Sequence, residues 1–147
     1  MSADDFPALA AQIRHFVGAQ GFMKLLGAEI DLLEPGLCVM SVARRPELLQ
    51  QDGLFHGGVT AFLVDNATTT AAATRREMDQ RVLTAEYKLN LIAPARGDRL
   101  VCRASLLKPG RMSVVEARVF SLADGAETLT AAALATIAML PGPVRAG

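Results

Sequence analysis

The sequence predicts an α+β fold in which a curved antiparallel sheet of about six strands wraps around one long central helix. From residue 59 to residue 74 the chain carries a single charged side chain, Asp65, so this helix should be buried on nearly every side. Two strand-forming segments precede the helix and four follow it, joined by short connections. An antiparallel sheet around the helix buries its apolar surface and keeps those connections short.

The individual elements follow from spacing and from turn residues. Residues 4–17 have apolar side chains three or four apart and predict an N-terminal helix that ends at Gly18. The central helix is expected from Gly57 to about Glu77, after a loop at residues 47–58. The remaining segments predict strands: residues 22–46, which hold two strands around a turn at 34–36, and then residues 82–94, 98–108, 112–122 and 127–140.

The strand at residues 82–94 carries an alternating pattern. Apolar side chains at odd-numbered positions from Ala85 to Leu91 alternate with Glu86, Lys88 and Asn90. This period of two predicts a strand with one dry face and one wet face.

Composition bounds the class of protein. The 147 residues fit a single domain over residues 1–147, with an N-terminal helix and turn at 1–21 and a tail at 141–147. Fifteen basic and fifteen acidic side chains give zero net charge, which argues against nucleic-acid binding and favours self-association.

No apolar run is long enough to span a membrane, and the acidic N-terminus lacks a secretory pattern, so a cytoplasmic protein is expected. Cys38 and Cys102 lie in apolar runs and are expected to be buried thiols.

Asp65 is the residue that most needs an explanation. An ionised carboxylate in apolar surroundings is costly, so it is normally paired, neutralised or functional. With 100° per residue, Gly58, Ala61, Thr69 and Ala72 fall within about 40° of Asp65 on the helix surface. The acid therefore lies on a stripe of small side chains that another molecule can approach closely. The alternative is a buried acid bonded only to backbone.

The start of the central helix offers a second chemical feature. Gly57 and Gly58 are expected to leave backbone N–H groups bare at the positive end of the helix dipole, where a carbonyl oxygen gaining charge would be stabilised. Asp65 follows Gly57 by eight residues, roughly 12 Å along the axis. One reacting carbon could not touch both groups of one helix, but it could touch Gly57 of one chain and Asp65 of an antiparallel copy. On spacing alone, His56 is a capping or packing histidine and the glycine pair is turn chemistry.

Three stretches of the chain match a known pattern: "GLFHGGVTAFLVDNATTTAA", "LTAEYKLNLIAPARGDRL" and "LKPGRMSVVEARVF". Together they resemble the HGG-type hotdog-fold acyl-CoA thioesterases, the group that includes the phenylacetate-pathway enzyme and the small mammalian thioesterases. The resemblance covers about Phe22 to Leu140. It implies a hotdog fold, a homodimer or a dimer of dimers with sites at the dimer interface, and hydrolysis of acyl-CoA thioesters without a cofactor or metal ion.

The same resemblance assigns roles to residues. Asp65 matches the catalytic carboxylate, acting as nucleophile or as the base that activates water, and the Gly57 N–H matches the group that polarises the thioester carbonyl. His56 matches a positioning residue, and Thr84 falls where a hydroxyl orients the water or the acid. Gln50 stands where many members carry asparagine, and Gln51 matches a loop glutamine. Gln51, Gly58 and Leu83 are candidates for substrate contact. Because the family binds CoA near the sheet edge and the helix starts, Arg96, Lys108, Gly110 and Arg111 are the candidates for contact with CoA.

Other readings remain open from the sequence. A non-catalytic acyl-CoA-binding hotdog domain is the main alternative, and Gln50 in place of asparagine favours it. A hotdog dehydratase is less favoured, because the histidine and aspartate spacing of that reaction is absent. The acyl group could be aryl, hydroxyaryl or medium-chain, with Phe55 and Phe62 as candidate pocket residues. The sequence does not choose between a covalent route and water activation.

Overall fold

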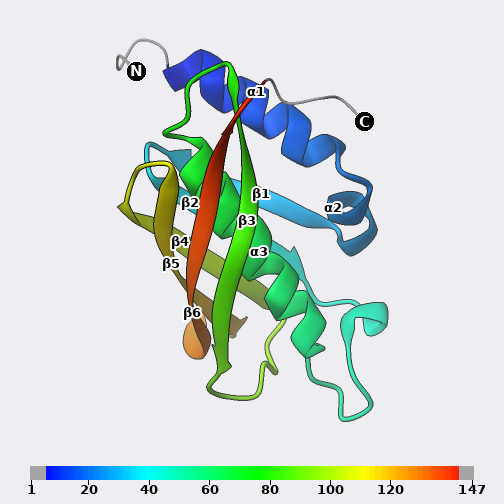
Figure 1. Ribbon diagram of the computed structural model, residues 1–147. Coiled ribbons are helices and arrows are strands. Elements are labelled where there is room, and N and C mark those ends of the chain that lie inside the picture. The colour runs from blue at the N-terminus through cyan, green and yellow to red at the C-terminus, as the bar shows by residue number, and fades with distance from the viewer. Residues whose placement is uncertain (1–5, 143–147) are drawn as a thin grey trace.

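A six-stranded antiparallel sheet wraps around helix α3 (Gly57–Ala73) in the computed structural model, which describes residues 6–142 (Figure 1). Helices α1 (Phe6–Ala19) and α2 (Gly21–Leu26) come first. The strands are β1 (Ala28–Glu34), β2 (Leu37–Ala43), β3 (Gln80–Leu91), β4 (Arg99–Lys108), β5 (Met112–Ala123) and β6 (Ala126–Pro141), and a short 3-10 turn spans Pro46–Leu48. The strand order is β1-β2-β4-β5-β6-β3. The predicted fold class is therefore confirmed.

Helix α3 is buried because five strands contact it. It packs against β2, β3, β4, β5 and β6, and Leu63, Val64 and Ala67 are completely buried. The helix ends at Ala73, four residues before the predicted end at Glu77. The Thr74 hydroxyl donates to the Ala71 carbonyl and accepts the Gly36 N–H (2.7 Å), which ties the end of the helix to the β1–β2 turn.

The prediction of a strand from Phe22 to Leu26 is wrong. These residues form α2, which ends at Gly27 with a φ of 66°, a left-handed conformation that favours glycine. A five-residue run with four apolar side chains has too little periodicity to separate a strand from a helical turn. The N-terminal helix is confirmed, but it runs to Ala19 instead of ending at Gly18; the predicted start at Asp4 lies outside the described residues.

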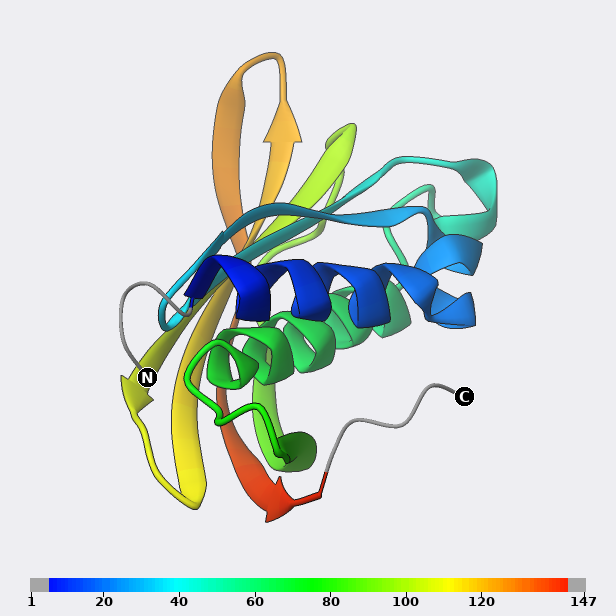
Figure 2. The same cartoon turned by 90° about the horizontal axis from the view of Figure 1, so that it is seen from above.

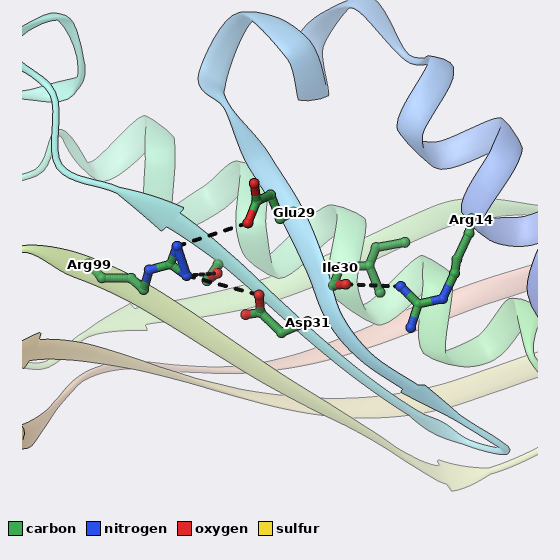
Figure 3. A network of polar contacts seen from close by, with 6 residues as sticks. Arg14, Glu29, Ile30, Asp31 and Arg99 are labelled. Atoms are coloured by element: carbon green, nitrogen blue, oxygen red, sulfur yellow. Dashed lines mark hydrogen bonds and ion pairs between the residues drawn. The ribbon is translucent and has the colours of Figure 1, made fainter.

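One edge of the sheet, strand β1, is covered within the chain. Arg14 of α1 donates to the Ile30 carbonyl (2.9 Å), and Arg99 of β4 lies 4.0 Å from both Glu29 and Asp31 (Figure 3). The pairing of β1 with β2 also carries an irregularity between residues 30 and 32. Acidic side chains, a bulge and a packed helix are devices that prevent a further strand from pairing.

The opposite edge, strand β3, is open and carries exposed apolar side chains. Leu83, Tyr87 and Leu91 are exposed by 54%, 37% and 62%. The predicted dry face from Ala85 to Leu91 is therefore wrong for the single chain, because only Leu89 among its odd-numbered residues is partly buried. A register shift between Thr84 and Glu86 interrupts the alternation, and an edge strand has a neighbour on one side only.

Both cysteines are buried and unpaired, as predicted. Burial raises the pKa of the Cys38 thiol to about 12 and raises that of Cys102 as well, so neither is a nucleophile at neutral pH. Within residues 6–142, none of the helices is long and apolar enough to cross a membrane.

Replacing Gly97 by alanine should destabilise the fold. A Cβ at this position would lie 2.0 Å from the Leu122 carbonyl oxygen, and the Gly97 N–H already donates to the Ser121 hydroxyl. We expect the free energy of unfolding to fall by about 3 kcal/mol or more, measured by urea denaturation. Gly18→Ala is the matched control, because its Cβ would meet no atom within 4 Å and the residue is helical. Equal stability of the two variants would contradict the packing at residue 97.

Candidate active site

The start of α3 is capped by His56. Its Nδ1 accepts the Gly58 N–H at 2.9 Å, and its carbonyl accepts the Val59 N–H, also at 2.9 Å. A Cβ on Gly58 would lie 3.0 Å from His56 Nδ1, so glycine allows this cap to close. Of the two N–H groups predicted to be bare, the one on Gly58 is therefore occupied. The Gly57 N–H makes no hydrogen bond to any residue in the described part of the chain.

Gly57 opens into a cavity of about 350 Å³ between the loop before α3 and the loop after β3. We call this the Gly57 cavity. Its lining residues are Gln50, Leu54, Phe55, Gly57, Thr60, Leu91, Ile92, Ala93, Pro94, Ala95 and Thr130. A Cβ on Gly57 would lie 3.4 Å from Leu91 Cδ1, so glycine keeps this side of the helix start open.

Arg44 holds the two walls of the Gly57 cavity together. Its guanidinium donates to the Arg96 carbonyl (2.9 Å) and the Gly97 carbonyl (3.2 Å) on one wall, and to the Gly53 carbonyl on the other. The Phe55 N–H adds a backbone bond to the Ala95 carbonyl (3.0 Å). No sequence pattern indicates this role of Arg44, because its partners are backbone carbonyls of two separate loops, and every residue type has a backbone carbonyl.

The two candidate glutamines have different surroundings. Gln50 lines the Gly57 cavity, and its Oε1 accepts the Asp52 N–H at 2.9 Å. Gln51 is exposed and lines neither the Gly57 cavity nor the cavity that contains Asp65. The structure thus brings Gln50 next to Gly57 and leaves Gln51 outside.

Asp65 faces a separate cavity of about 540 Å³, which we call the Asp65 cavity. Its Oδ1 accepts a hydrogen bond from the Thr84 hydroxyl at 2.6 Å, and that hydroxyl lies 2.7 Å from the Thr69 hydroxyl. Because the single hydrogen of Thr84 goes to Asp65, Thr69 must donate to Thr84. The result is a chain of two hydroxyl groups that ends on one carboxylate oxygen.

The small-residue stripe predicted around Asp65 faces this cavity in large part. Gly58, Ala61 and Thr69 line it, whereas Ala72 is completely buried. Thr69 is not among the predicted site residues, although its place on the stripe beside Asp65 could have identified it. The other lining residues are Gln20, Phe22, Phe62, Asn66, Val82, Leu83, Thr84 and Tyr87. Both candidate phenylalanines line a cavity, Phe55 beside Gly57 and Phe62 beside Asp65.

One chain does not bring all candidates together. Gly57 and Asp65 line different cavities, as expected for groups roughly 12 Å apart along one helix. The basic candidates are also separated. Arg96 lies in the loop beside the Gly57 cavity, whereas Lys108, Gly110 and Arg111 lie at the β4–β5 hairpin, beyond the opposite end of α3 (Figure 1). Over residues 6–142 there is no group of three histidine, cysteine or acidic side chains that could hold a metal ion.

Comparisons with known proteins identify the family. The thioesterase superfamily model matches residues 52–127. A crystal structure of a thioesterase family protein from Silicibacter pomeroyi superposes with a TM-score of 0.89 and 36% identity, covering 91% of this chain and 99% of that one. Acyl-coenzyme A thioesterase 13 of Homo sapiens is 30% identical over 107 residues, covering 71% of this chain and 75% of the relative.

A third relative is 1,4-dihydroxy-2-naphthoyl-CoA hydrolase of Listeria monocytogenes, 27% identical over 119 residues, or 81% of this chain and 95% of the relative. The helix wrapped by an antiparallel sheet is the hotdog fold of these thioesterases, as the resemblance implied. The chain belongs to the thioesterase superfamily.

Proposed function

We propose that this protein hydrolyses acyl-CoA thioesters to a free carboxylic acid and CoA. The observation that carries the proposal is the Asp65 carboxylate, which is held by the Thr84 hydroxyl and faces an open cavity from an otherwise uncharged helix. Two of the relatives support the CoA ester as substrate, because their names describe an acyl-coenzyme A thioesterase and a naphthoyl-CoA hydrolase.

Asp65 has one oxygen held and one free. Thr84 occupies Oδ1, and Oδ2 has no hydrogen-bond partner among residues 6–142. Fixing Oδ1 sets the orientation of the carboxylate, so that Oδ2 can take a proton from water or attack a carbonyl carbon. Thr69 and Thr84 are therefore positioning residues, and Asp65 is the group that reacts.

The Gly57 N–H is suited to the developing negative charge on the thioester oxygen. It is unoccupied and lies at the positive end of the α3 dipole. Gln50 lies in the same cavity, and because its Oε1 is engaged by Asp52, its Nε2 hydrogens are the donors that it retains.

A second copy of the chain would join these two half-sites. The exposed apolar side chains of β3 line both cavities: Leu91 lines the Gly57 cavity, and Leu83 and Tyr87 line the Asp65 cavity. If two β3 strands pair antiparallel, the Leu91 end of one strand approaches the Leu83 end of the other. Such a pairing would set Gly57 of one copy near Asp65 of its partner, so the proposed enzyme is a homodimer with two sites.

In the proposed reaction, water attacks the thioester carbonyl carbon while Asp65 takes its proton. A C–O bond forms, the C–S bond breaks, and the proton passes to the departing CoA thiolate. In the covalent variant, an Asp65 oxygen forms a C–O bond with the carbonyl carbon, the C–S bond breaks and CoA leaves as the thiolate. Water then hydrolyses the mixed anhydride, which releases the acid and the Asp65 carboxylate, and the proton given up by the water goes to the thiolate. Both routes use the same carboxylate and the same N–H group.

Asp65→Asn should abolish turnover while the fold persists. We expect kcat to fall by at least about a hundredfold, because the amide cannot take a proton or attack the carbonyl. Thiol release is followed with a thiol-reactive dye on short, long and aromatic acyl-CoAs. Asp124→Asn is the matched control, since this exposed aspartate lies in the β5–β6 turn at a φ of 49°, which asparagine tolerates.

The same thiol-release experiment can also contradict the proposal. If the wild-type protein releases no thiol from any thioester and still binds CoA esters, the enzyme proposal fails. The protein would then be a non-catalytic acyl-CoA-binding domain.

Thr84→Val should slow the reaction more than it weakens binding. Losing a hydrogen bond to a charged group costs about 1.5–3 kcal/mol, which corresponds to a fall in kcat of about 10- to 100-fold. Thr84→Ser keeps the hydroxyl and should retain most of the activity. If the valine and serine variants have the same kcat, the hydroxyl does not position Asp65.

A further inference from the structure

A third cavity, of about 300 Å³, continues from the Asp65 cavity between α1, α3 and β3. We call it the α1–α3 groove. It shares five lining residues with the Asp65 cavity: Gln20, Asn66, Thr69, Val82 and Leu83. A group held at Asp65 can therefore extend into this groove without leaving the protein surface.

The groove exists because α3 presents small side chains toward α1. The two helices lie side by side and run in opposite directions (Figure 2). On α3, the lining positions 66, 69, 70 and 73 form one helical stripe; on α1, positions 13, 16 and 17 form another, and Gln20, between α1 and α2, continues the lining. The α1 stripe is mostly apolar, with Ile13, Phe16 and Val17, whereas Thr69, Thr70 and Ala73 of α3 are too short to fill the space between the helices.

Both ends of the groove are marked by a hydrogen bond between side chains. At the Asp65 end, Asn66 Nδ2 donates to Gln20 Oε1 at 3.0 Å. At the far end, the Arg76 guanidinium donates to Gln12 Oε1 and to the carbonyls of Glu77 and Gln80, both at 2.9 Å. Arg76 is only 2% exposed. A buried, hydrogen-bonded guanidinium is a poor neighbour for a methyl group, so it closes the groove to an apolar chain.

We propose that the α1–α3 groove binds the alkyl chain of a linear acyl group and that Arg76 with Gln12 limits its length. The inference rests on the proposed function, because it concerns the acyl group whose carbonyl lies at Asp65. From position 66 to position 73, α3 rises by about 10 Å. At about 1.3 Å per carbon for C–C bonds of about 1.5 Å, this length accommodates roughly eight carbons.

The shape of the groove selects a chain over a ring. The lining extends over two full helical stripes and along β3 from Leu83 back to Arg81. A single aromatic ring beside Asp65 would occupy the Asp65 cavity and leave the groove empty. The substrate class assigned by the structure is therefore medium-chain acyl-CoA.

The test is a chain-length series of acyl-CoAs from acetyl to palmitoyl, with benzoyl-CoA as the aromatic probe. We expect kcat/KM to rise by up to about fourfold per added methylene, the equivalent of about 0.8 kcal/mol for each buried methylene. The rise should stop near octanoyl or decanoyl, where the chain reaches Arg76. A profile without dependence on chain length, or a preference for benzoyl-CoA, would overturn the proposal.

Two variants should change, in opposite directions, the chain length at which kcat/KM stops rising. Ala73→Leu fills the far part of the groove, just before Arg76, and should shift the optimum to shorter chains. Gln12→Ala removes the side-chain acceptor that holds the Arg76 guanidinium at the far end, and should extend the optimum to longer chains. Ala8→Leu, on the exposed face of α1, is the matched control and should leave the profile unchanged. Thermal melting checks that both groove variants are folded. If they are folded and the chain length at which kcat/KM stops rising changes in neither, the groove is not the site of the acyl chain.

Binding separates failure of this proposal from failure of the proposed function. The Kd of each CoA ester is measured by calorimetry with the Asp65→Asn variant. If nothing is hydrolysed by the wild type but Kd shows the same break near octanoyl, the groove stands and the enzymatic proposal fails. If thioesters are hydrolysed but neither Kd nor kcat/KM depends on chain length, the enzymatic proposal stands and the groove proposal fails.

Discussion

The burial of most of α3 against the curved sheet is the constraint on which the rest of the structure depends. A helix in contact with five strands can carry a charged side chain at low cost only where the strands leave a gap. Asp65 lies at such a gap, between the open edge at β3 and the start of α2. There the Thr84 hydroxyl donates to the carboxylate and the Thr69 hydroxyl donates to Thr84. The position of the carboxylate is thus a consequence of how the sheet closes around the helix.

Much of this arrangement could be predicted from local sequence. The uncharged run around Asp65 predicted the buried helix, and the separation of Gly57 from Asp65 predicted that one helix cannot bring both to one carbonyl. The stripe of small residues pointed to the open side of α3, where Gly58, Ala61 and Thr69 line the cavity. These properties depend on periodicity within one element, which the sequence displays directly.

The parts that could not be predicted depend on contacts between distant segments. Arg44 joins two loops through backbone carbonyls, and Arg76 reaches Gln12 across 64 positions of the chain. The cap of His56 occupies the Gly58 N–H, which leaves one free N–H where the sequence suggested two. The helical conformation of the six residues of α2 depends on packing and on the left-handed Gly27 that ends the helix. Periodicity over so short a run is weak, so the sequence pattern predicts a strand there.

The two edges of the sheet differ in a way that determines how many chains can associate through them. Strand β1 is blocked by acidic side chains, a bulge and the Arg14 contact, whereas β3 is long, carries exposed apolar side chains and is paired on one side only, with β6. Indefinite growth of a sheet needs two pairing edges on every chain, one for each neighbour. A chain with a single usable edge can pair only with the same edge of another copy, which is a closed two-fold arrangement. The asymmetry of this sheet therefore protects the protein against polymerising into a fibre, even though one of its edges is exposed and hydrophobic.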